Sequence, residues 1–303
     1  MSIAIYSDPF KDIDYRLSTA AACKLVDLGR DVIISHPVAC PSSYRSKITV
    51  DEGFLAQRIE TLAKNEPDLE LYRDCELVLS FGGDGTFLAT AHKAHRLGIP
   101  LVGVNLGSLG FMTEIDPMDL MAALEQIDRG DYEIEERMTL DVRLETEDGE
   151  EGRFLALNDA VVSRGTGARI LSLELYLEGR YIETIQCDGV IVSTPTGSTG
   201  YAMAAGGPIV DPTMELMQIT PICPHSLHSR SYVVRTDEVV GLRLYQGYRD
   251  LPPLSIDGRN AGYLEAQRNW VNVRKGEQPV KIAVLKAQDF FRELPDKLRG
   301  RGQ

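Results

Sequence analysis

The sequence feature that most constrains the fold is an apolar run, residues 77–81, that stops in three glycines around one carboxylate, Gly82-Gly83-Asp84-Gly85. The run is short and does not alternate with polar residues, which is typical of a strand buried on both faces of a parallel sheet. Thr86 follows, and we expect its hydroxyl to cap a helix that begins there. The glycines therefore lie in a turn at the carboxyl end of a strand, where open α/β sheets bind ligands.

The turn alone leaves two interpretations open. In the first, Asp84 only caps the helix in a tight connection. In the second, the glycines let a ligand approach the backbone, and the helix N-terminus favours an anion such as phosphate. Asp84 is the only ionisable residue within the turn.

Composition limits the classes of protein to consider. With 303 residues, 43% of them hydrophobic, the chain can bury a large core, and we expect two domains. Five scattered cysteines without a Cys-x-x-Cys pair indicate reduced thiols, and no apolar segment approaches the roughly 20 residues of a membrane span. We expect a soluble, cytoplasmic protein without a membrane partner. The net charge of −13 gives no indication of nucleic-acid binding, which usually requires a basic surface. Phosphate binding by such an acidic chain would need backbone N–H groups, a few local cations or a divalent metal.

The first part of the chain has an α/β pattern. Strands are expected at 2–8 and 31–35 around an amphipathic helix at 15–28, which indicates a parallel sheet with right-handed crossovers. Residues 40–74 are interpreted as a loop with a peripheral helix. A further buried strand, 99–105, ends in a second glycine turn, which should lie beside the first at the same edge of the sheet. Neither turn contains Gly-Lys-Ser/Thr or Gly-x-Gly-x-x-Gly, so a kinase of this kind would be neither a P-loop enzyme nor a protein kinase.

The pattern changes near residue 133 to a period of two, which is typical of an antiparallel sheet. The strands expected after this point are 139–145, 155–163, 171–177, 181–187, 239–245, 254–256 and 270–274. The expected turns are Glu147–Glu150, Glu178-Gly179-Arg180, Asp257-Gly258 and Asn260-Ala261-Gly262. A strand at 280–285 and a helix at 289–299 end the chain. We therefore predict an α/β domain with a parallel sheet over 1–132, a mainly antiparallel, β-sandwich-like domain over 133–278, and a segment, 279–303, that returns to the first domain.

A second motif lies at 187–208, where a buried strand runs into a loop of hydroxyls and glycines, Ser193-Thr-Pro-Thr-Gly-Ser-Thr-Gly200. By composition it is either a structural loop or a site whose hydroxyl and N–H groups bind ribose and adenine, with Tyr201 as a stacking surface. Cys223, His225 and His228 have a spacing compatible with zinc, but no fourth ligand is visible, so we assign no metal ligands.

The two motifs together resemble the signatures of the NAD kinase family. GGDGT at 82–86 is shared with diacylglycerol kinases and 6-phosphofructokinases, whereas DGVIVSTPTGSTGYAMAAGGPIV at 188–210 is similar to the nucleoside-binding signature of NAD kinases alone. Weaker matches are 106–111, 137–138, 157–159, 220–227 and 255–258. Two positions depart from the pattern, because Asp159 stands for the usual Glu and Gly200 for a frequent Ala. The resemblance implies transfer of a phosphoryl group from ATP or polyphosphate to the 2′-hydroxyl of the adenosine ribose of NAD.

The resemblance also implies roles for single residues. Asp84 would be the base that accepts the hydroxyl proton. The nucleotide-binding residues would be Gly83, Gly85, Thr86, Phe111, Asn158, Asp159, Asp188, Thr196, Thr199, Gly200, Tyr201 and Asp257. Asp257 would reach the site of a neighbouring subunit in a homodimer or homotetramer. Mg²⁺ or another divalent cation would enter with the phosphoryl donor. The alternatives are a lipid or other small-molecule kinase with the same GGDGT motif, and a non-catalytic sensor of NAD(P).

Overall fold

The computed structural model describes residues 1–51, 69–72, 74–107, 110–147, 149–166, 169–226, 228–245, 248, 250–266, 268–286 and 290–300. The described residues form two compact units. The α/β unit contains those up to residue 136 together with those from 280 onward, and the β unit contains those of 137–279.

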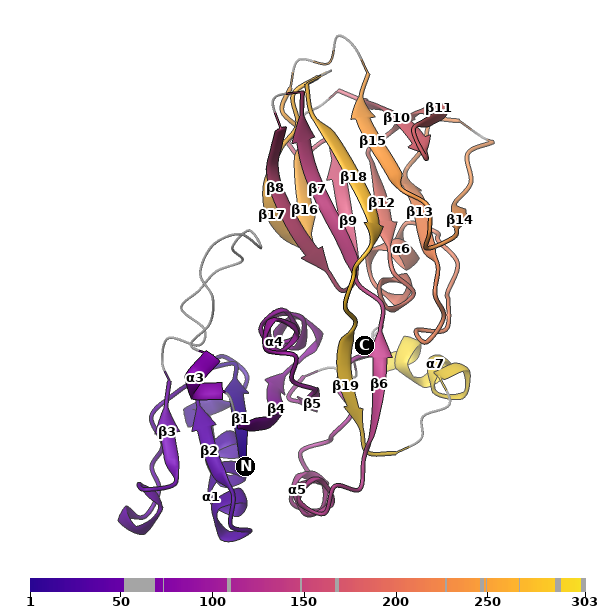
Figure 1. Ribbon diagram of the computed structural model, residues 1–303. Helices are drawn as coiled ribbons and strands as arrows, with labels where there is room; N and C mark the ends of the chain where they lie inside the picture. The colour runs from indigo at the N-terminus through magenta and orange to yellow at the C-terminus, as the bar shows by residue number, and fades with distance from the viewer. Residues whose placement is uncertain are drawn as a thin grey trace. The chain divides into compact units, whose positions relative to one another are not determined.

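The α/β unit is built on a seven-stranded sheet with the order β3-β2-β1-β4-β5-β19-β6 (Figure 1). Its strands are β1 (Ser2–Ser7), β2 (Asp31–Ile34), β3 (Ile48–Val50), β4 (Cys75–Gly82), β5 (Leu101–Asn105), β6 (Glu133–Arg137) and β19 (Val280–Val284). Its helices are α1 (Arg16–Asp27), α3 (Leu69–Tyr72), α4 (Asp84–Leu97), α5 (Leu120–Asp128) and α7 (Phe290–Gly300). The pairs from β3 through β5 to β19 are parallel, as the sequence predicts.

The central strands of this sheet are buried on both faces, which explains why their sequences do not alternate. Ile3 and Ile5 of β1 and Leu77 and Leu79 of β4 are at most 1% exposed. They pack in one cluster with apolar residues of α1 and α5. Each fully buried side chain of this size contributes about 1.5–3 kcal/mol to folding, so the cluster stabilises the packing of β1 and β4 against α1 and α5.

Most strand and helix predictions for this unit are confirmed within a few residues, but the interpretation of 40–74 was incomplete. A three-residue strand, β3, pairs in parallel with β2 at the edge of the sheet, and a 3₁₀ turn precedes it at Ser42–Tyr44. Because the strand has only three residues and Thr49 and Val50 are exposed, its sequence shows too little hydrophobic periodicity to predict a strand. Residues 52–68 of this segment, with Ser108, Leu109, Asp148, Leu227 and Asp289 of other predicted features, lie outside the described residues.

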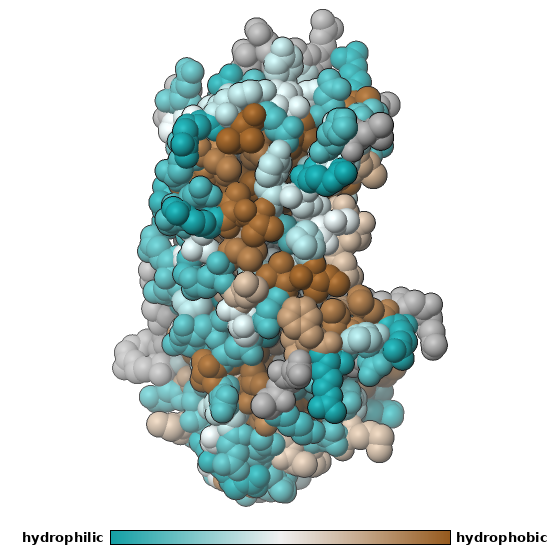
Figure 2. Space-filling view, turned by 90° about the vertical axis from the view of Figure 1, so that its right-hand side faces the viewer, coloured by the Kyte–Doolittle hydropathy of each residue, from teal (hydrophilic) through white to brown (hydrophobic). Residues whose placement is uncertain are grey.

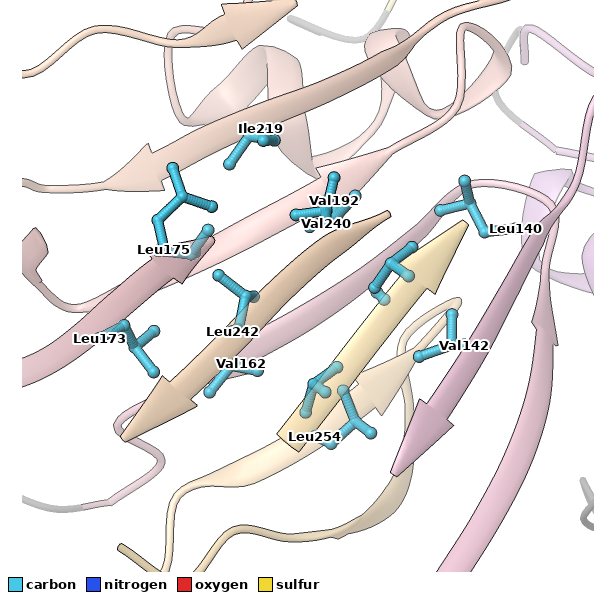
Figure 3. Packing of buried hydrophobic residues seen from close by; sticks show 14 of the residues in the cluster. Leu140, Val142, Val162, Leu173, Leu175, Val192, Ile219, Val240, Leu242 and Leu254 are labelled. Carbon is cyan, nitrogen blue, oxygen red and sulfur yellow. The ribbon is translucent and has the colours of Figure 1, made fainter. Parts of the chain in front are cut away.

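The β unit contains two six-stranded sheets, with orders β11-β10-β15-β18-β7-β8 and β14-β13-β12-β9-β16-β17. The strands are β7 (Leu140–Thr146), β8 (Gly149–Ala156), β9 (Asp159–Ser163), β10 (Leu171–Leu177), β11 (Arg180–Cys187), β12 (Gly189–Ser193), β13 (Met217–Ile222), β14 (Tyr232–Val234), β15 (Val240–Leu244), β16 (Pro253–Ile256), β17 (Arg259–Tyr263) and β18 (Trp270–Lys275). Apolar side chains from both sheets, such as Leu173 and Val192, form one core (Figure 3). The predicted combination of an α/β unit with a mainly antiparallel β unit is confirmed.

Two predictions in the β unit were wrong. Residues 155–163 do not form one strand, because the chain leaves the first sheet after Ala156 and enters the second at Asp159. Residues 260–262 are part of β17 and not a turn, because they pair with β16 across an irregularity at Leu254/Ser255. Alternation and turn propensity, which were the signals used, do not reveal a change of sheet or a bulge.

The tight turns are confirmed at two hairpins. Glu178 and Gly179 have φ of 51° and 70°, and Asp257 and Gly258 have φ of 47° and 77°. In both, the flanking residues pair directly, as in Leu177 with Arg180 and Ile256 with Arg259. Two central residues with positive φ define the hairpin turn that Asp-Gly favours.

The surface carries both hydrophilic and apolar residues (Figure 2). On the face shown in Figure 2, hydrophilic residues cover most of the area, with apolar residues gathered in several places between them. None of the described helices combines the length and apolar character that crossing a membrane would require.

Candidate active site

The Gly82–Thr86 turn joins β4 to α4. The first helical hydrogen bond runs from Phe87 N–H to the carbonyl of Gly83 at 2.9 Å, so Gly83 is the N-cap and Asp84 the first residue of the helix. The prediction that Thr86 caps the helix was therefore wrong by three residues. Its buried hydroxyl instead donates to Asp8 Oδ2 at 2.9 Å.

The carboxylate of Asp84 is held by the loop that follows β5. It accepts hydrogen bonds from Phe111 N–H at 3.1 Å and Met112 N–H at 3.2 Å. A Cβ on Gly110 would lie 2.1 Å from Asp84 Oδ1, so only glycine leaves room for the carboxylate. The predicted proximity of the two glycine turns is confirmed, because β4 and β5 are parallel neighbours and Leu106 N–H donates to Gly82 O at 2.8 Å.

Phe111 is half-buried and contacts the last helix of the unit. Its ring centroid lies 6.5 Å from that of Phe290 and 5.9 Å from Lys297 Nζ. The neighbouring Glu114 accepts N–H groups of Leu285 and Lys286 at 2.9–3.2 Å. The C-terminal segment thus supports the loop that holds Asp84.

Sequence reasoning missed the loop after β1 at this edge. Ser7 pairs with Phe81, so residues 8–12 emerge beside the glycine turn. They bring in Asp8, which binds Thr86, and Lys11, whose Nζ would lie 2.4 Å from a Cβ on Gly83. The available signal was the charged residues at and just after the end of the first predicted strand, Asp8, Lys11 and Asp12, because the carboxyl ends of parallel strands share one edge.

In the β unit, the corner where the chain changes sheets is held by Asp257. Its carboxylate accepts the N–H groups of Leu157, Asn158 and Asp159 at 2.8–3.0 Å. These bonds satisfy the backbone groups that a strand partner would otherwise take. The structure therefore gives Asp257 a place within its own chain, and its action in a neighbouring subunit stays a prediction.

Asp159, whose N–H group is one of the three that Asp257 accepts, has a side chain in the interior and is only 5% exposed. Burial, with a smaller contribution from the charge of Asp257, raises the pKa of Asp159 to about 7. The carboxyl group therefore holds a proton in weakly acidic solution, where an ordinary aspartate would be charged.

The hydroxyl-rich loop at 194–199 is buried, and most of its hydroxyls bond within the unit. Thr194 Oγ1 donates to Leu157 O at 2.6 Å and Thr199 Oγ1 to Thr196 O at 3.2 Å. A Cβ on Gly197 would lie 2.2 Å from Asn158 O, so the loop and the corner are in close contact. Two buried oxygens, Thr196 Oγ1 and Asn158 Oδ1, have no hydrogen-bond partner among the described residues.

Two further predicted residues, Tyr201 and Asp188, lie at different ends of this part of the chain, because Tyr201 follows the loop and Asp188 lies at the opposite end of β12. Tyr201 begins a short helix, α6 (Tyr201–Ala204), and 47% of its surface is exposed, as a stacking surface requires. Asp188 precedes β12 and pairs with Arg164 at 3.1 Å. The predicted residues are thus divided between the two units. Gly83, Asp84, Gly85, Thr86 and Phe111 belong to the α/β unit, and Asn158, Asp159, Asp188, Thr196, Thr199, Gly200, Tyr201 and Asp257 to the β unit.

Comparisons with known proteins agree over most of the chain. Residues 42–132 match the ATP-NAD kinase N-terminal domain, and residues 157–285 match the ATP-NAD kinase C-terminal domain. The NAD kinase of Caldanaerobacter subterraneus subsp. tengcongensis is 43% identical over 232 residues, which cover 77% of this chain and 81% of that protein. The NAD kinase of Geotalea daltonii is 40% identical over 249 residues, covering 82% and 86%.

Two solved structures have a similar fold. Yeast NADH kinase complexed with NADH superimposes with a TM-score of 0.77 at 21% identity, covering 100% of this chain and 86% of that one. An NAD kinase from Archaeoglobus fulgidus in complex with ATP superimposes with a TM-score of 0.69 at 26% identity, covering 99% of each chain.

Proposed function

Because the chain belongs to the NAD kinase family, we propose that it transfers the terminal phosphoryl group of ATP or polyphosphate to the 2′-hydroxyl of the adenosine ribose of NAD. The observation that carries the proposal is the carboxylate of Asp84, fixed by two main-chain N–H groups at the carboxyl end of β4. A ribose hydroxyl is a weak nucleophile, and a carboxylate fixed in this way is suited to accept its proton.

The reaction balances with Asp84 as base. The 2′-oxygen forms a bond to the terminal phosphorus, the bond from that phosphorus to the leaving phosphate oxygen breaks, and the hydroxyl proton passes to Asp84. The products are NADP and ADP, or a polyphosphate shortened by one unit. A carboxylate has about four acceptor positions, so it can take this proton while Phe111 and Met112 hold it. In a loose transition state the other requirements are positioning and neutralisation of the phosphate charge.

The β unit supplies groups suited to the nucleoside. Thr196 Oγ1 and Asn158 Oδ1 are buried oxygens without a partner among the described residues, and a ligand with hydroxyl or amide donors would satisfy them. The exposed ring of Tyr201 is suited to stack on adenine. Thr199 and Gly200 shape the loop that presents these groups, because Thr199 donates to Thr196 O and Gly200 N–H to Gly197 O.

A divalent cation such as Mg²⁺ is proposed as part of the donor substrate. Over the described ranges, no three His, Cys, Asp or Glu side chains gather in a way that could hold a metal ion. A Mg²⁺–ATP complex would carry its cation into the site on the phosphates.

The test is to incubate the protein with Mg²⁺–ATP or polyphosphate and NAD, and to measure NADP with a dehydrogenase that accepts only the 2′-phosphorylated cofactor. NAD that lacks the 2′-hydroxyl is the matched control and should give no product. Absence of NADP with every donor would refute the proposal. Binding of NAD without turnover would identify a sensor instead.

The family resemblance also supports a cytoplasmic homodimer or homotetramer. Light scattering on the purified protein would measure the number of chains. A monomer that is fully active would exclude any need for a neighbouring subunit.

A further inference from the structure

We propose that Lys11 binds the terminal phosphates of the phosphoryl donor, and this inference rests on the proposed function. Lys11 lies outside both sequence motifs and outside the residues matched by the family domains. Its loop connects β1 to α1, and its ammonium group reaches the glycine turn that carries Asp84.

The first observation is the position of the ammonium group. Lys11 Nζ lies where a side chain on Gly83 would begin, 2.4 Å from the position of its Cβ, and 3.4 Å from the Cβ position of Gly107. Gly83 and Gly107 belong to the two glycine turns at the ends of β4 and β5. The lysine thus occupies the space that these two glycines leave open. Beside the Cβ position of Gly85, next to Asp84, none of the described residues outside its own helix segment has an atom within 4 Å, which leaves space there for a ligand.

The second observation is how the loop is held in place. Asp8, three residues before Lys11, accepts the hydroxyl of Thr86 at 2.9 Å and the N–H of Phe10 at 2.9 Å. Asp12, directly after Lys11, accepts N–H groups of Leu17 and Ser18 at 3.0 Å, which begin α1. The loop is therefore bonded on one side to the catalytic turn and on the other to the first helix.

The same loop contains backbone strain. Asp14 and Tyr15 have φ of 55° and 52°, a left-handed conformation that residues other than glycine adopt at a cost of order 1 kcal/mol each. Tyr15 is held there by stacking on His36, with ring centroids 3.7 Å apart. Such strain persists where the surrounding structure needs the conformation, and here the conformation sets the exit of the loop that carries Lys11.

The third observation concerns charge. The carboxylates on either side of Lys11 bond to hydroxyl and N–H groups, and no ion pair joins Lys11 to any residue that the structure describes. In a chain with 45 acidic and 32 basic residues, an exposed lysine that has no carboxylate partner among the described residues and lies against the turn that carries Asp84 is suited to an external anion. Lysine binds phosphate as a compact charge with three donors, and this chain lacks the lysine of a P-loop.

In the proposed reaction, a cation at this position would reduce charge repulsion. The terminal phosphates of the donor must approach a hydroxyl beside the negatively charged Asp84, and a lysine at Gly83 would offset that repulsion. NAD also carries phosphates, so the experiment separates the two substrates. We assign Lys11 to the donor because its ammonium group lies between the two glycine turns.

The test compares Lys11→Met, which keeps the length but removes the charge, with Lys11→Arg, which keeps the charge. For Lys11→Met we expect kcat/KM for ATP to fall about 10- to 100-fold, with KM for NAD changed less than about twofold. Lys11→Arg should keep most of the activity. Lys47→Met is the matched control, since Lys47 lies beside Gly29 at the amino end of β2 and its Nζ only approaches the Gly29 carbonyl at 3.4 Å.

A binding measurement separates this inference from the proposed function. Calorimetric titration of the wild type with a non-hydrolysable ATP analogue should show binding that Lys11→Met weakens about tenfold or more and Lys47→Met does not. If the wild type binds the analogue but makes no NADP, the proposed function fails while Lys11 is still tested. Unchanged analogue binding in Lys11→Met, or a rise only in KM for NAD, would overturn the assignment.

Discussion

In each unit, main-chain N–H groups hold one of the aspartates that the family resemblance assigns to the site, and these two aspartates, Asp84 and Asp257, differ in what surrounds them. Asp84 accepts two N–H groups at the open edge of a parallel sheet, with the exposed Gly85 beside it. Asp257 accepts three N–H groups where the chain passes from one sheet to the other, and one of the three belongs to the buried Asp159. The same chemical interaction therefore occurs in two settings, an open sheet edge, where we propose that Asp84 meets a ligand, and a corner of the fold, which Asp257 holds in place.

The first test of this comparison is Asp84→Asn. The amide keeps the shape and one acceptor oxygen but cannot accept the hydroxyl proton, so kcat should fall about 10²- to 10⁴-fold. The melting temperature and the dissociation constant for NAD should change little. A normal kcat with a raised KM would make Asp84 a binding residue and remove the contrast with Asp257.

The same substitution at the other aspartate, Asp257→Asn, should act on stability. Three N–H groups would lose their charged acceptor, which we expect to lower the free energy of unfolding by about 3 kcal/mol. Asn keeps the hairpin turn favourable, so the loss should come from the corner itself. The single tryptophan, Trp270, lies on β18 and reports on the β unit by fluorescence during denaturation.

Mixed oligomers test whether Asp257 acts within its own chain or in the site of a neighbouring subunit. If its role lies within its own chain, co-expression of Asp84→Asn with Asp257→Asn should give no more activity than the single variants account for. If Asp257 acts on a neighbouring subunit, as the family resemblance implies, tagged mixed oligomers should recover part of the activity.

A third test uses the raised pKa of Asp159, about 7 against an ordinary value near 3.9. The folded state binds a proton that the unfolded state has lost, so the stabilisation is complete below pH 4 and is lost as the pH rises through 7. From pH 5 to 6.5 the wild type should lose about 2 kcal/mol relative to Asp159→Asn. Denaturation curves followed through Trp270 measure this difference, and parallel pH profiles of the two proteins would contradict it.

A group in the α/β unit, His36, makes stability depend on pH in the opposite direction. Burial lowers the pKa of His36 to about 4, partly offset by the charge of Asp12. A histidine with a lowered pKa contributes stability above its ordinary value near 6.5, and this contribution is lost as the pH falls through 4. The two groups oppose each other between pH 4 and 7, so a global melting temperature hides both, and hydrogen exchange on peptides of each unit is needed.

The same two regions show what sequence could predict. Leu77–Gly82 and the glycine turn were identified because strand burial and glycine placement are local properties. The edge strand β3, the change of sheet at Leu157–Asn158, and the bond from Thr86 to Asp8 depend on residues distant in the sequence. Lys11 was missed for the same reason, because its role follows from β1 and β4 being neighbours. The motifs predicted candidate site residues, whereas the structure shows which of them, such as Asp257, also hold the fold together.

The smallest expected effect is that of Tyr201→Ala, which tests whether the β unit binds while the α/β unit reacts. A stacking ring stabilises the bound ground state and transition state alike, so NAD binding should weaken by about 1–2 kcal/mol, or roughly 5- to 30-fold in dissociation constant. The turnover number at saturating NAD should stay within about twofold of the wild type. Tyr245→Ala, at a tyrosine of the same unit that is 51% exposed, is the control and should leave the dissociation constant unchanged. A reduced kcat with normal binding would instead place Tyr201 with Asp84 in the chemical step, and the division of roles between the two units would not hold.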